Sequence, residues 1–292
     1  MAQVLQEHAE SILFFGGLAV FSNWIAWSRG FYELPAAKKS TRLSPTLVQV
    51  LAAFAIYLGT TLLLVPLLAR LLFLFSTNTH SAGLPITWVS YLQLFSMLLA
   101  GLILFVFCKL QNPTLNQMIW KDPTIEPKRS PLFDFSFGVM AWIIAFPPVA
   151  VIGQISDLLL YVFFGVEHYE QVAVRYLKMT LGSPSLLLSA LFLILIAAPI
   201  LEELLFRGFL QSHLKAHVGA KSAILITALC FALFHLSVSQ GLGNISLAIT
   251  LFCFACFLGF IYERQGSLFA SIGLHTAFNA VSSFRILFLP ES

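Results

Sequence analysis

Two adjacent glutamates and an arginine lie within a long apolar segment of the chain. Glu203 and Arg207 have the i,i+4 spacing at which an acidic residue followed by a basic one pairs on one helix face. Glu202 has no base at that spacing, and a carboxylate without a cationic partner in a low-dielectric site suits a general base. Pro199 cannot donate a backbone hydrogen bond, so we expect a free carbonyl near residue 195 and room for water there. The alternative is an ion pair that only holds helices together, but such a pair does not need the second buried carboxylate of Glu202.

Two later apolar segments carry the other candidate residues. One segment contains Phe231-x-x-x-His235, and the other contains His275-x-x-x-Asn279. His275 and Asn279 share a helix face, where a ring nitrogen and an amide could hydrogen-bond one oxygen atom. A single His on an apolar helix is more often a packing residue. Two His, one Asn and a spare Glu on three segments indicate a functional site.

These residue types are compatible with two kinds of hydrolytic chemistry. A carboxylate and a histidine can position and deprotonate water, while a His and an Asn donate to the oxyanion that forms when water attacks an amide. Alternatively, Glu202, His235 and His275 have the ligand types of a catalytic zinc site, which commonly has three protein ligands and one water. The chain has no H-E-x-x-H and no G-x-S-x-G sequence, so the zinc-protease helix and a serine nucleophile of that kind are absent.

The composition of the chain indicates a membrane protein. Of its 292 residues, 59% are apolar and only 10% are Asp, Glu, Lys or Arg, against about 25% in soluble domains. A water-soluble domain of this size cannot bury so much apolar surface. The net charge of only +3 excludes a basic nucleic-acid-binding protein, and the mean hydropathy of +0.89 excludes disorder. Because no strand-like alternation competes with the apolar runs, we predict an all-α integral membrane protein.

Eight apolar runs are long enough to span a bilayer, which takes about 20 residues. They lie at residues 11–28, 47–75, 86–108, 135–165, 186–213, 221–238, 245–262 and 267–289. The fourth run contains Pro147-Pro148, which must kink or break it, so it is either one tilted span or a span with a half-helix. We divide the chain into residues 1–185, with the first four spans, and residues 186–289, a four-helix core that carries every candidate residue.

The charges of the loops predict the orientation of the spans. Lys and Arg concentrate in the odd-numbered loops, so the positive-inside rule places those loops in the cytoplasm and both termini outside it. Residues 1–10 contain no Lys or Arg, so we expect the first span to be retained rather than cleaved as a signal peptide. Residues 166–184 predict a short amphipathic helix on the membrane surface. Cys253 and Cys256 lie in an apolar run, which favours helix packing over a redox or metal site.

Taken in order, these motifs resemble those of the CAAX-protease and bacteriocin-processing family, which includes the type II CAAX prenyl endopeptidases and bacterial Abi proteins. The resemblance covers residues 186–287 and rests on three motifs: Glu202-Glu203-x-x-x-Arg207, Phe231-x-x-x-His235 and His275-x-x-x-Asn279. Each motif alone is weak, but three in this order on successive hydrophobic helices are specific. The resemblance implies an intramembrane endopeptidase of about eight helices with a water-accessible cavity.

The resemblance also implies roles for the matched residues. Glu202 with His235 would activate the water, and His275 with Asn279 would stabilise the oxyanion. The residues implied to support them are Glu203, Arg207 and Phe231. The family has been described both as metalloproteases and as glutamate-dependent proteases. Asn279 is a poor zinc ligand and a good oxyanion donor, so we expect no cofactor, with zinc held by Glu202, His235 and His275 as the alternative.

The resemblance points to a substrate in the bilayer, either a membrane protein or a lipidated peptide of the CAAX type, and not to nucleic acid. Two other functions stay open. A proton-coupled transporter or channel would use ionisable residues spaced along a path through the bilayer, whereas the spans of residues 1–185 add only Arg70 and Asp157. A non-catalytic immunity or scaffold protein with the same fold is expected to have degenerate motifs, and the motifs of this chain are intact.

Overall fold

The structure is a computed structural model that describes residues 2–35, 43–75, 85–125, 127–166 and 170–289. Within these ranges the secondary structure is helical, apart from an isolated bridge between Lys121 and Ser267, which confirms the all-α prediction for the described residues. The helices are α1 (Ala2–Ser28), α2 (Leu47–Leu58), η1 (Gly59–Leu64), α3 (Val65–Phe75), α4 (Ile86–Leu110), α5 (Pro113–Trp120), α6 (Pro131–Phe164), α7 (Val172–Thr180), α8 (Pro184–Phe192), η2 (Leu193–Ala197), α9 (Ala198–Glu203), η3 (Leu204–Gln211), α10 (Ser212–Phe234), η4 (Val238–Gln240), α11 (Gly243–Gln265) and α12 (Leu268–Phe288). The segments η1, η2 and η3 are π-helical, and η4 is a 3₁₀-helix.

Among the described residues, six helices are long and apolar enough to cross a membrane, and the chain is an integral multi-pass membrane protein. They are Leu5–Ser28, Leu47–Leu71, Ile86–Leu110, Pro131–Phe164, Pro184–Phe234 and Gly243–Gln265. The fifth of these contains two predicted spans, which Gly219 separates with non-helical backbone angles (φ 78°, ψ 167°). The six do not include α12, so the count of eight spans stays a prediction.

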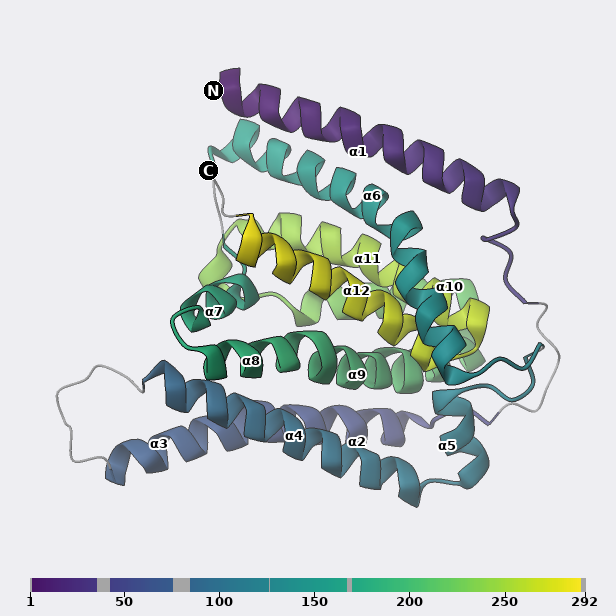
Figure 1. The fold of residues 1–292 in the computed structure, drawn as a ribbon. Helices are drawn as coiled ribbons and strands as arrows, with labels where there is room; N and C mark the ends of the chain where they lie inside the picture. Colours follow the sequence, from purple (N-terminus) through teal and green to yellow (C-terminus); the bar gives the residue numbers. More distant parts are fainter. Residues whose placement is uncertain (1, 36–42, 76–84, 126, 167–169, 290–292) are drawn as a thin grey trace.

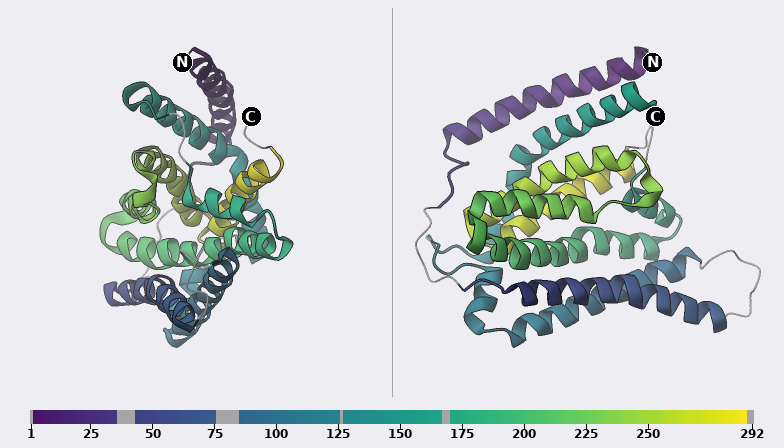
Figure 2. Two further views of the ribbon diagram at one scale, coloured as in Figure 1. Left: turned by 90° about the vertical axis from the view of Figure 1, so that its left-hand side faces the viewer. Right: turned by 180° about the vertical axis from the view of Figure 1, so that it is seen from behind.

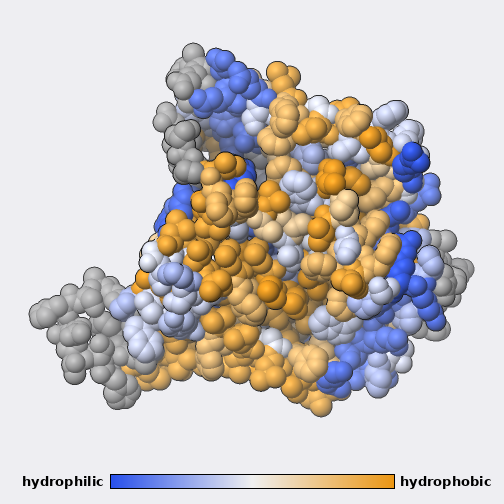
Figure 3. All heavy atoms as spheres, viewed as in Figure 1, coloured by the Kyte–Doolittle hydropathy of each residue, from blue (hydrophilic) through white to orange (hydrophobic). Residues whose placement is uncertain are grey.

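The helices form layers that run in nearly the same direction (Figures 1 and 2). Figure 1 shows α1 and α6 on one edge, α10, α11 and α12 in the centre next to α8 and α9, and α2, α3 and α4 on the opposite edge. Apolar residues cover the middle of the molecule, and polar residues lie toward both its left-hand and right-hand ends in Figure 3. The start of α1 and the end of α12 lie at the same end of the bundle. Which side of the membrane that end faces stays a prediction.

One continuous helix, α6, forms the fourth predicted span. The Ser130 side chain accepts a hydrogen bond from the Phe133 backbone at its start, and Gly165 ends it with a left-handed backbone (φ 67°). Pro147 and Pro148 lie in the middle of its 34 residues, and Figure 1 shows α6 bending near its middle. A proline lacks the N–H group and its ring crowds the preceding turn, which accounts for the bend. The alternative of a span followed by a separate half-helix is therefore wrong.

Two glycines bring the backbones of α6 and α12 into contact. A Cβ atom on Gly138 would lie 1.9 Å from the carbonyl oxygen of Ala270, and one on Gly273 would lie 2.2 Å from that of Phe135. Small residues are common where membrane helices meet, because apolar side chains gain little by leaving lipid and the helices depend on close packing. This contact fixes α12, the helix that carries His275, against α6.

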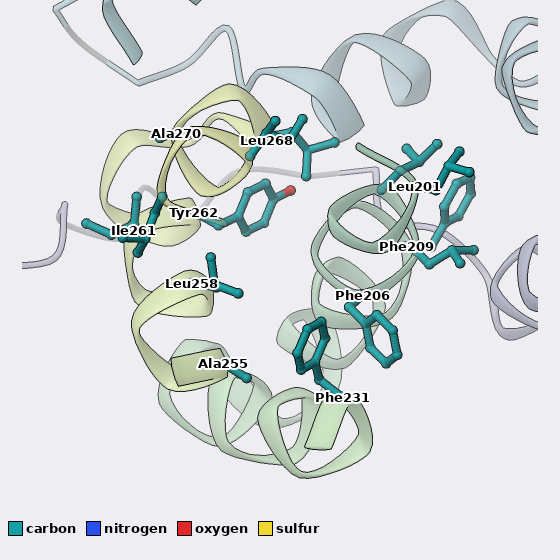
Figure 4. Packing of buried hydrophobic residues seen from close by; sticks show 14 of the residues in the cluster. Leu201, Phe206, Phe209, Phe231, Ala255, Leu258, Ile261, Tyr262, Leu268 and Ala270 are labelled. Carbon is teal, nitrogen blue, oxygen red and sulfur yellow. The ribbon is translucent and has the colours of Figure 1, made fainter. Parts of the chain in front are cut away.

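A packed apolar core surrounds the candidate residues. Figure 4 shows Phe231 of α10 and Leu258 of α11 pointing into the space between their helices and η3. Phe206 of η3 packs against Phe231, and Phe209 of η3 packs on the other side against Phe107 of α4. The side chains of Phe206, Phe209, Phe231 and Leu258 are fully buried. Van der Waals contacts between such side chains are individually weak and collectively large. They hold η3, α10, α11 and α12 at fixed positions around the polar residues described below.

The region between the fourth and fifth predicted spans contains the short helix α7, as predicted. Leu177 and Thr180 of α7 are buried, while Lys178 is exposed and pairs with Glu170 at 2.8 Å. Residues 167–169 of the predicted segment lie outside the described residues, and the placement of α7 on the membrane surface stays a prediction. All four cysteines of the chain are free, and their role in packing stays a prediction.

Candidate active site

The two glutamates end α9, a short α-helical piece between the π-helical segments η2 and η3. A π-helical turn accommodates an additional residue and so changes the direction of the side chains that follow, and such turns are frequent at functional sites. Glu202 is 8% exposed and Glu203 is fully buried. Adjacent residues on a helix point in different directions, and the two carboxylates accordingly have different partners.

The carbonyls of η2 accept hydrogen bonds from α12. Pro199 cannot donate to the turn before it, and Leu195 O instead accepts from Thr276 Oγ1 at 3.0 Å. Ile194 O accepts from Asn279 Nδ2 at 2.8 Å. The carbonyl near residue 195 is therefore not free but bonded to α12, and the expected room for water there stays a prediction. Side chains of α12 satisfy these carbonyls and attach that helix to the one that carries the glutamates.

Glu203 lies at the centre of a fully buried polar cluster. Its Oε1 atom accepts from Arg207 Nη1 at 3.0 Å and from His275 Nδ1 at 2.8 Å. Arg207 Nη2 also donates to Ala255 O of α11 at 3.1 Å, and its guanidinium lies 4.7 Å from the centre of the Phe231 ring. The predicted Glu203–Arg207 pair is confirmed. The bond to His275 joins residues 72 positions apart, and no local pattern in the sequence predicts it.

Glu202 faces both histidines. Its Oε2 atom lies 3.5 Å from His235 Nε2 and 3.8 Å from His275 Nε2, and it has no hydrogen-bond partner among the described residues. These distances exceed that of a direct hydrogen bond and are ones that a bridging water can span. The structure therefore brings together three of the four predicted catalytic residues, while the described hydrogen bond of Asn279 goes to η2.

His235 lies at the end of α10 rather than within a span that continues to residue 238. α10 ends at Phe234, and His235 is its C-cap. His235 Nδ1 lies 2.8 Å from Phe231 O, and since a carbonyl oxygen only accepts, Nδ1 carries the proton and Nε2 is left facing Glu202. The Phe231 ring also lies 4.5 Å from the His235 ring and 5.9 Å from the His275 ring, measured between centroids.

The polar residues of this site therefore come from α9, η3, α10 and α12, and all seven residues of the three motifs lie between residues 184 and 281. Residues 184–281 match the type II CAAX prenyl endopeptidase Rce1-like family model. This match confirms the family resemblance that the motifs predict, over about a third of the chain. The Rce1-like segment begins with the first residue of α8 and ends within α12, and its family implies a CAAX-type protease. The chain matches no curated protein and no solved structure in the corresponding comparisons.

Within the Rce1-like segment, the buried polar cluster continues along η3 as a ladder of residues at intervals of four. Gln211, four residues after Arg207, donates from Nε2 to Gly259 O and to Glu263 Oε1, both at 3.1 Å. Lys215, four residues further, pairs with Glu263. A Cβ atom on Gly259 would lie 2.7 Å from Gln211 Oε1. Gln211 and Glu263 were not predicted as part of the site, although their spacing from Arg207 and from Ala255 along the helices indicates a shared face.

The donor types of the Rce1-like segment match those of catalytic zinc. Zinc ligands lie about 2.0–2.2 Å from the ion, so three of them must converge on one point. In the part of the chain that the structure describes, no group of three His, Cys, Asp or Glu side chains is placed to hold a metal ion. We therefore derive no step through a metal.

Proposed function

We propose that the chain is an intramembrane endopeptidase in which Glu202 and His235 activate a water molecule. The observation that carries this proposal is the position of Glu202 Oε2, a buried oxygen without a hydrogen-bond partner among the described residues that faces two imidazole nitrogens. Burying a carboxylate oxygen without a hydrogen-bond partner costs free energy, so a functional ligand for that oxygen is expected. Activating water for attack on a peptide carbonyl gives it a use, and the family match supports this reaction.

In this mechanism a water molecule lies between Glu202 and His235. Both Glu202 Oε2 and the Nε2 atom of a neutral His235 are acceptors, so the two hydrogens of one water satisfy both and leave an oxygen lone pair for attack. As the C–O bond forms, one water proton passes to Glu202 and the carbonyl π electrons move onto the oxygen. The tetrahedral intermediate then collapses, the C–N bond breaks, and the proton passes from Glu202 to the departing amine.

His275 and Asn279 supply the donors for the oxyanion. The Glu203 carboxylate accepts from His275 Nδ1. In this mechanism the His275 ring is an imidazolium from the start of the cycle, so its Nε2 donates to the oxyanion and keeps its proton throughout. Asn279 uses one N–H of its amide on Ile194 O and has a second N–H for the substrate. Donors held in place before the reaction stabilise a developing oxyanion without reorganisation, and loss of one costs about 10²–10³ in kcat.

The proposed substrate is a membrane-anchored, lipidated peptide of the CAAX type, which is the substrate class that the family description names. We assign catalysis to residues 186–289 and a surrounding role to residues 1–185. The proposed mechanism uses no metal, and zinc held by Glu202, His235 and His275 is the alternative. Dialysis against a chelator should leave the rate unchanged under the first mechanism and abolish it under the second.

The test is cleavage of a farnesylated CAAX peptide by the purified full chain in detergent. Glu202→Gln, His235→Ala and His275→Ala should each lower kcat by at least ~100-fold, in line with losses of acid–base and oxyanion groups. His217→Ala is the matched control, because His217 is an exposed histidine on α10 and should retain the full rate. If the three site variants fold normally and cleave as fast as wild type, the assignment of the site is wrong.

A further inference from the structure

Two adjoining cavities lie between α1, α6 and α11, and none of the candidate catalytic residues lines either of them. The first has a volume of about 450 Å³ and is mostly polar, and the second has a volume of about 660 Å³ and is mostly apolar. Arg29, directly after α1, and Arg264, near the end of α11, line both cavities. The two guanidinium groups therefore mark the place where the polar and the apolar cavities meet.

Two of the cationic side chains that line the polar cavity already form contacts within the protein. Lys121 pairs with Asp134 and also donates to the Arg129 carbonyl. Arg129 Nη1 donates to Gln265 Oε1 at 3.0 Å. These contacts join the segment before α6 to the end of α11. They keep the wall of the cavity in place and leave Arg29 and Arg264 as the cations at the junction.

The guanidinium groups at the junction have donors that the described residues do not use. Arg264 Nη1 donates to Gly30 O at 3.1 Å and to Glu33 O at 2.8 Å, and its guanidinium lies 5.2 Å from the centre of the Phe31 ring. The Nε atom of Arg264 is buried without a hydrogen-bond partner among the described residues. Arg29 is exposed and forms no ion pair with any described acidic residue. Glu33 also lines the polar cavity and interacts electrostatically with Arg264. The donors that the junction offers to an anion are therefore those of Arg29 and the Nε atom of Arg264.

The apolar cavity is a slot between the second half of α1 and the middle of α6. Leu18 and Ser22 line it from α1, and Trp142 and Phe146 line it from α6. Figure 1 shows α1 at the edge of the bundle beside α6, so the slot lies where lipid surrounds the protein. A slot of this size and composition fits a hydrocarbon chain.

We propose that the two cavities together bind one anionic phospholipid, with its phosphate at Arg29 and Arg264 and an acyl chain in the slot between α1 and α6. Guanidinium groups bind phosphate oxygens through paired, charge-assisted hydrogen bonds. A soluble anion would leave the apolar slot without a ligand, and a lipid without a phosphate would leave the guanidinium donors unpaired. Basic pockets between membrane helices bind anionic head groups of the cytoplasmic leaflet, and the predicted orientation places this end of the bundle in the cytoplasm.

The test is native mass spectrometry of the purified full chain with phosphatidylglycerol and with diacylglycerol of identical acyl chains, which lacks the phosphate. We expect phosphatidylglycerol to bind about tenfold more tightly, which corresponds to one charge-assisted hydrogen-bonded contact. Arg29→Gln should remove this preference, and Ser22→Phe should weaken binding of both lipids by filling the slot. Lys109→Gln is the matched control, because Lys109 is an exposed cation in the last turn of α4 and should leave binding unchanged.

Several outcomes overturn the proposal. Equal binding of the two lipids, or an unchanged preference in Arg29→Gln, means that the junction does not select phosphate. Displacement of the lipid by glycerol phosphate alone identifies a site for a soluble anion, and displacement by a farnesylated peptide identifies a part of the substrate path. Melting temperatures measured without added lipid show whether Ser22→Phe folds. Leu18→Trp blocks the same slot from an adjacent turn of α1, and unaltered lipid binding in both variants also overturns the proposal.

Discussion

His275 Nδ1 lies 2.8 Å from Oε1 of Glu203, and both side chains are buried. Because the carboxylate accepts from this nitrogen, the other ring nitrogen, Nε2, is directed toward Glu202. Glu203 also accepts from Arg207, so it holds a cation from its own helix and a ring from α12 with the same oxygen. Glu203 therefore orients the His275 ring in addition to pairing with Arg207.

Glu203→Gln should lower kcat by about 10²–10⁴ with little change in KM. The amide keeps the shape of the side chain but cannot hold His275 in the same protonation state, and the corresponding change in serine proteases costs about 10⁴. The variant should also be destabilised by about 3–5 kcal/mol, because Arg207 is then left buried without a carboxylate. Peptide cleavage and thermal unfolding of the purified protein measure the two effects.

The double variant Glu203→Gln/Arg207→Gln separates these two effects. With both charges removed, part of the lost stability should return, because no uncompensated charge remains buried. Activity should stay low, because the ring of His275 still lacks its carboxylate. Recovery of kcat together with stability would show that Glu203 acts only as a structural partner of Arg207.

Asn279→Ala and Thr276→Val should have different effects on catalysis. Both side chains donate to carbonyls of η2, so each variant should lose about 1 kcal/mol of stability as a partly buried carbonyl loses its donor. Only Asn279 is proposed to donate to the oxyanion, so Asn279→Ala should lower kcat by about 10²–10³, whereas Thr276→Val should stay within about threefold of wild type. Equal kcat values in the two variants would limit Asn279 to docking α12.

Those parts of the site that depend on neighbours along one helix were predictable from the sequence. The Glu203–Arg207 pair follows from i,i+4 spacing, and a carbonyl near residue 195 that lacks its donor within the helix follows from the chemistry of Pro199. The all-α membrane class follows from composition alone. In each case the interacting groups lie within a few residues, so their relative positions are fixed by helix geometry.

Contacts between different helices were not predictable in the same way. The bond from His275 to Glu203 depends on the close approach of α12 to α6 at Gly138 and Gly273, which sets the rotation of α12. The position of His235 at the end of α10 rather than inside a span was missed because the apolar run continues past the helix. Hydropathy reports where residues tolerate lipid and does not report where a helix ends.

The glycine contact between α6 and α12 gives a further prediction. Gly273→Ala should be strongly destabilising, by about 1–3 kcal/mol or more, because the new methyl group would overlap the Phe135 carbonyl and force the helices apart. It should also lower kcat, since His275 is two residues away on the same helix. Gly17→Ala is the control, because a Cβ atom there meets nothing within 4 Å. A thermal unfolding curve of Gly273→Ala that coincides with that of Gly17→Ala would contradict the close approach.

The ladder along η3 predicts that stability and catalysis separate at Gln211. Gln211→Leu removes the hydrogen bonds to Gly259 and Glu263, and should cost about 1–3 kcal/mol because Glu263 is left with fewer donors in a buried position. Its kcat, measured at a temperature where the variant is folded, should stay within about threefold of wild type, because Gln211 contacts neither Glu203 nor a histidine in any described hydrogen bond. Arg207→Leu, one step closer along the same ladder, should lose both stability and activity, since it leaves Glu203 without its cation. A tenfold or larger fall in the kcat of folded Gln211→Leu would show instead that the ladder as a whole positions His275, and that the site extends to α11.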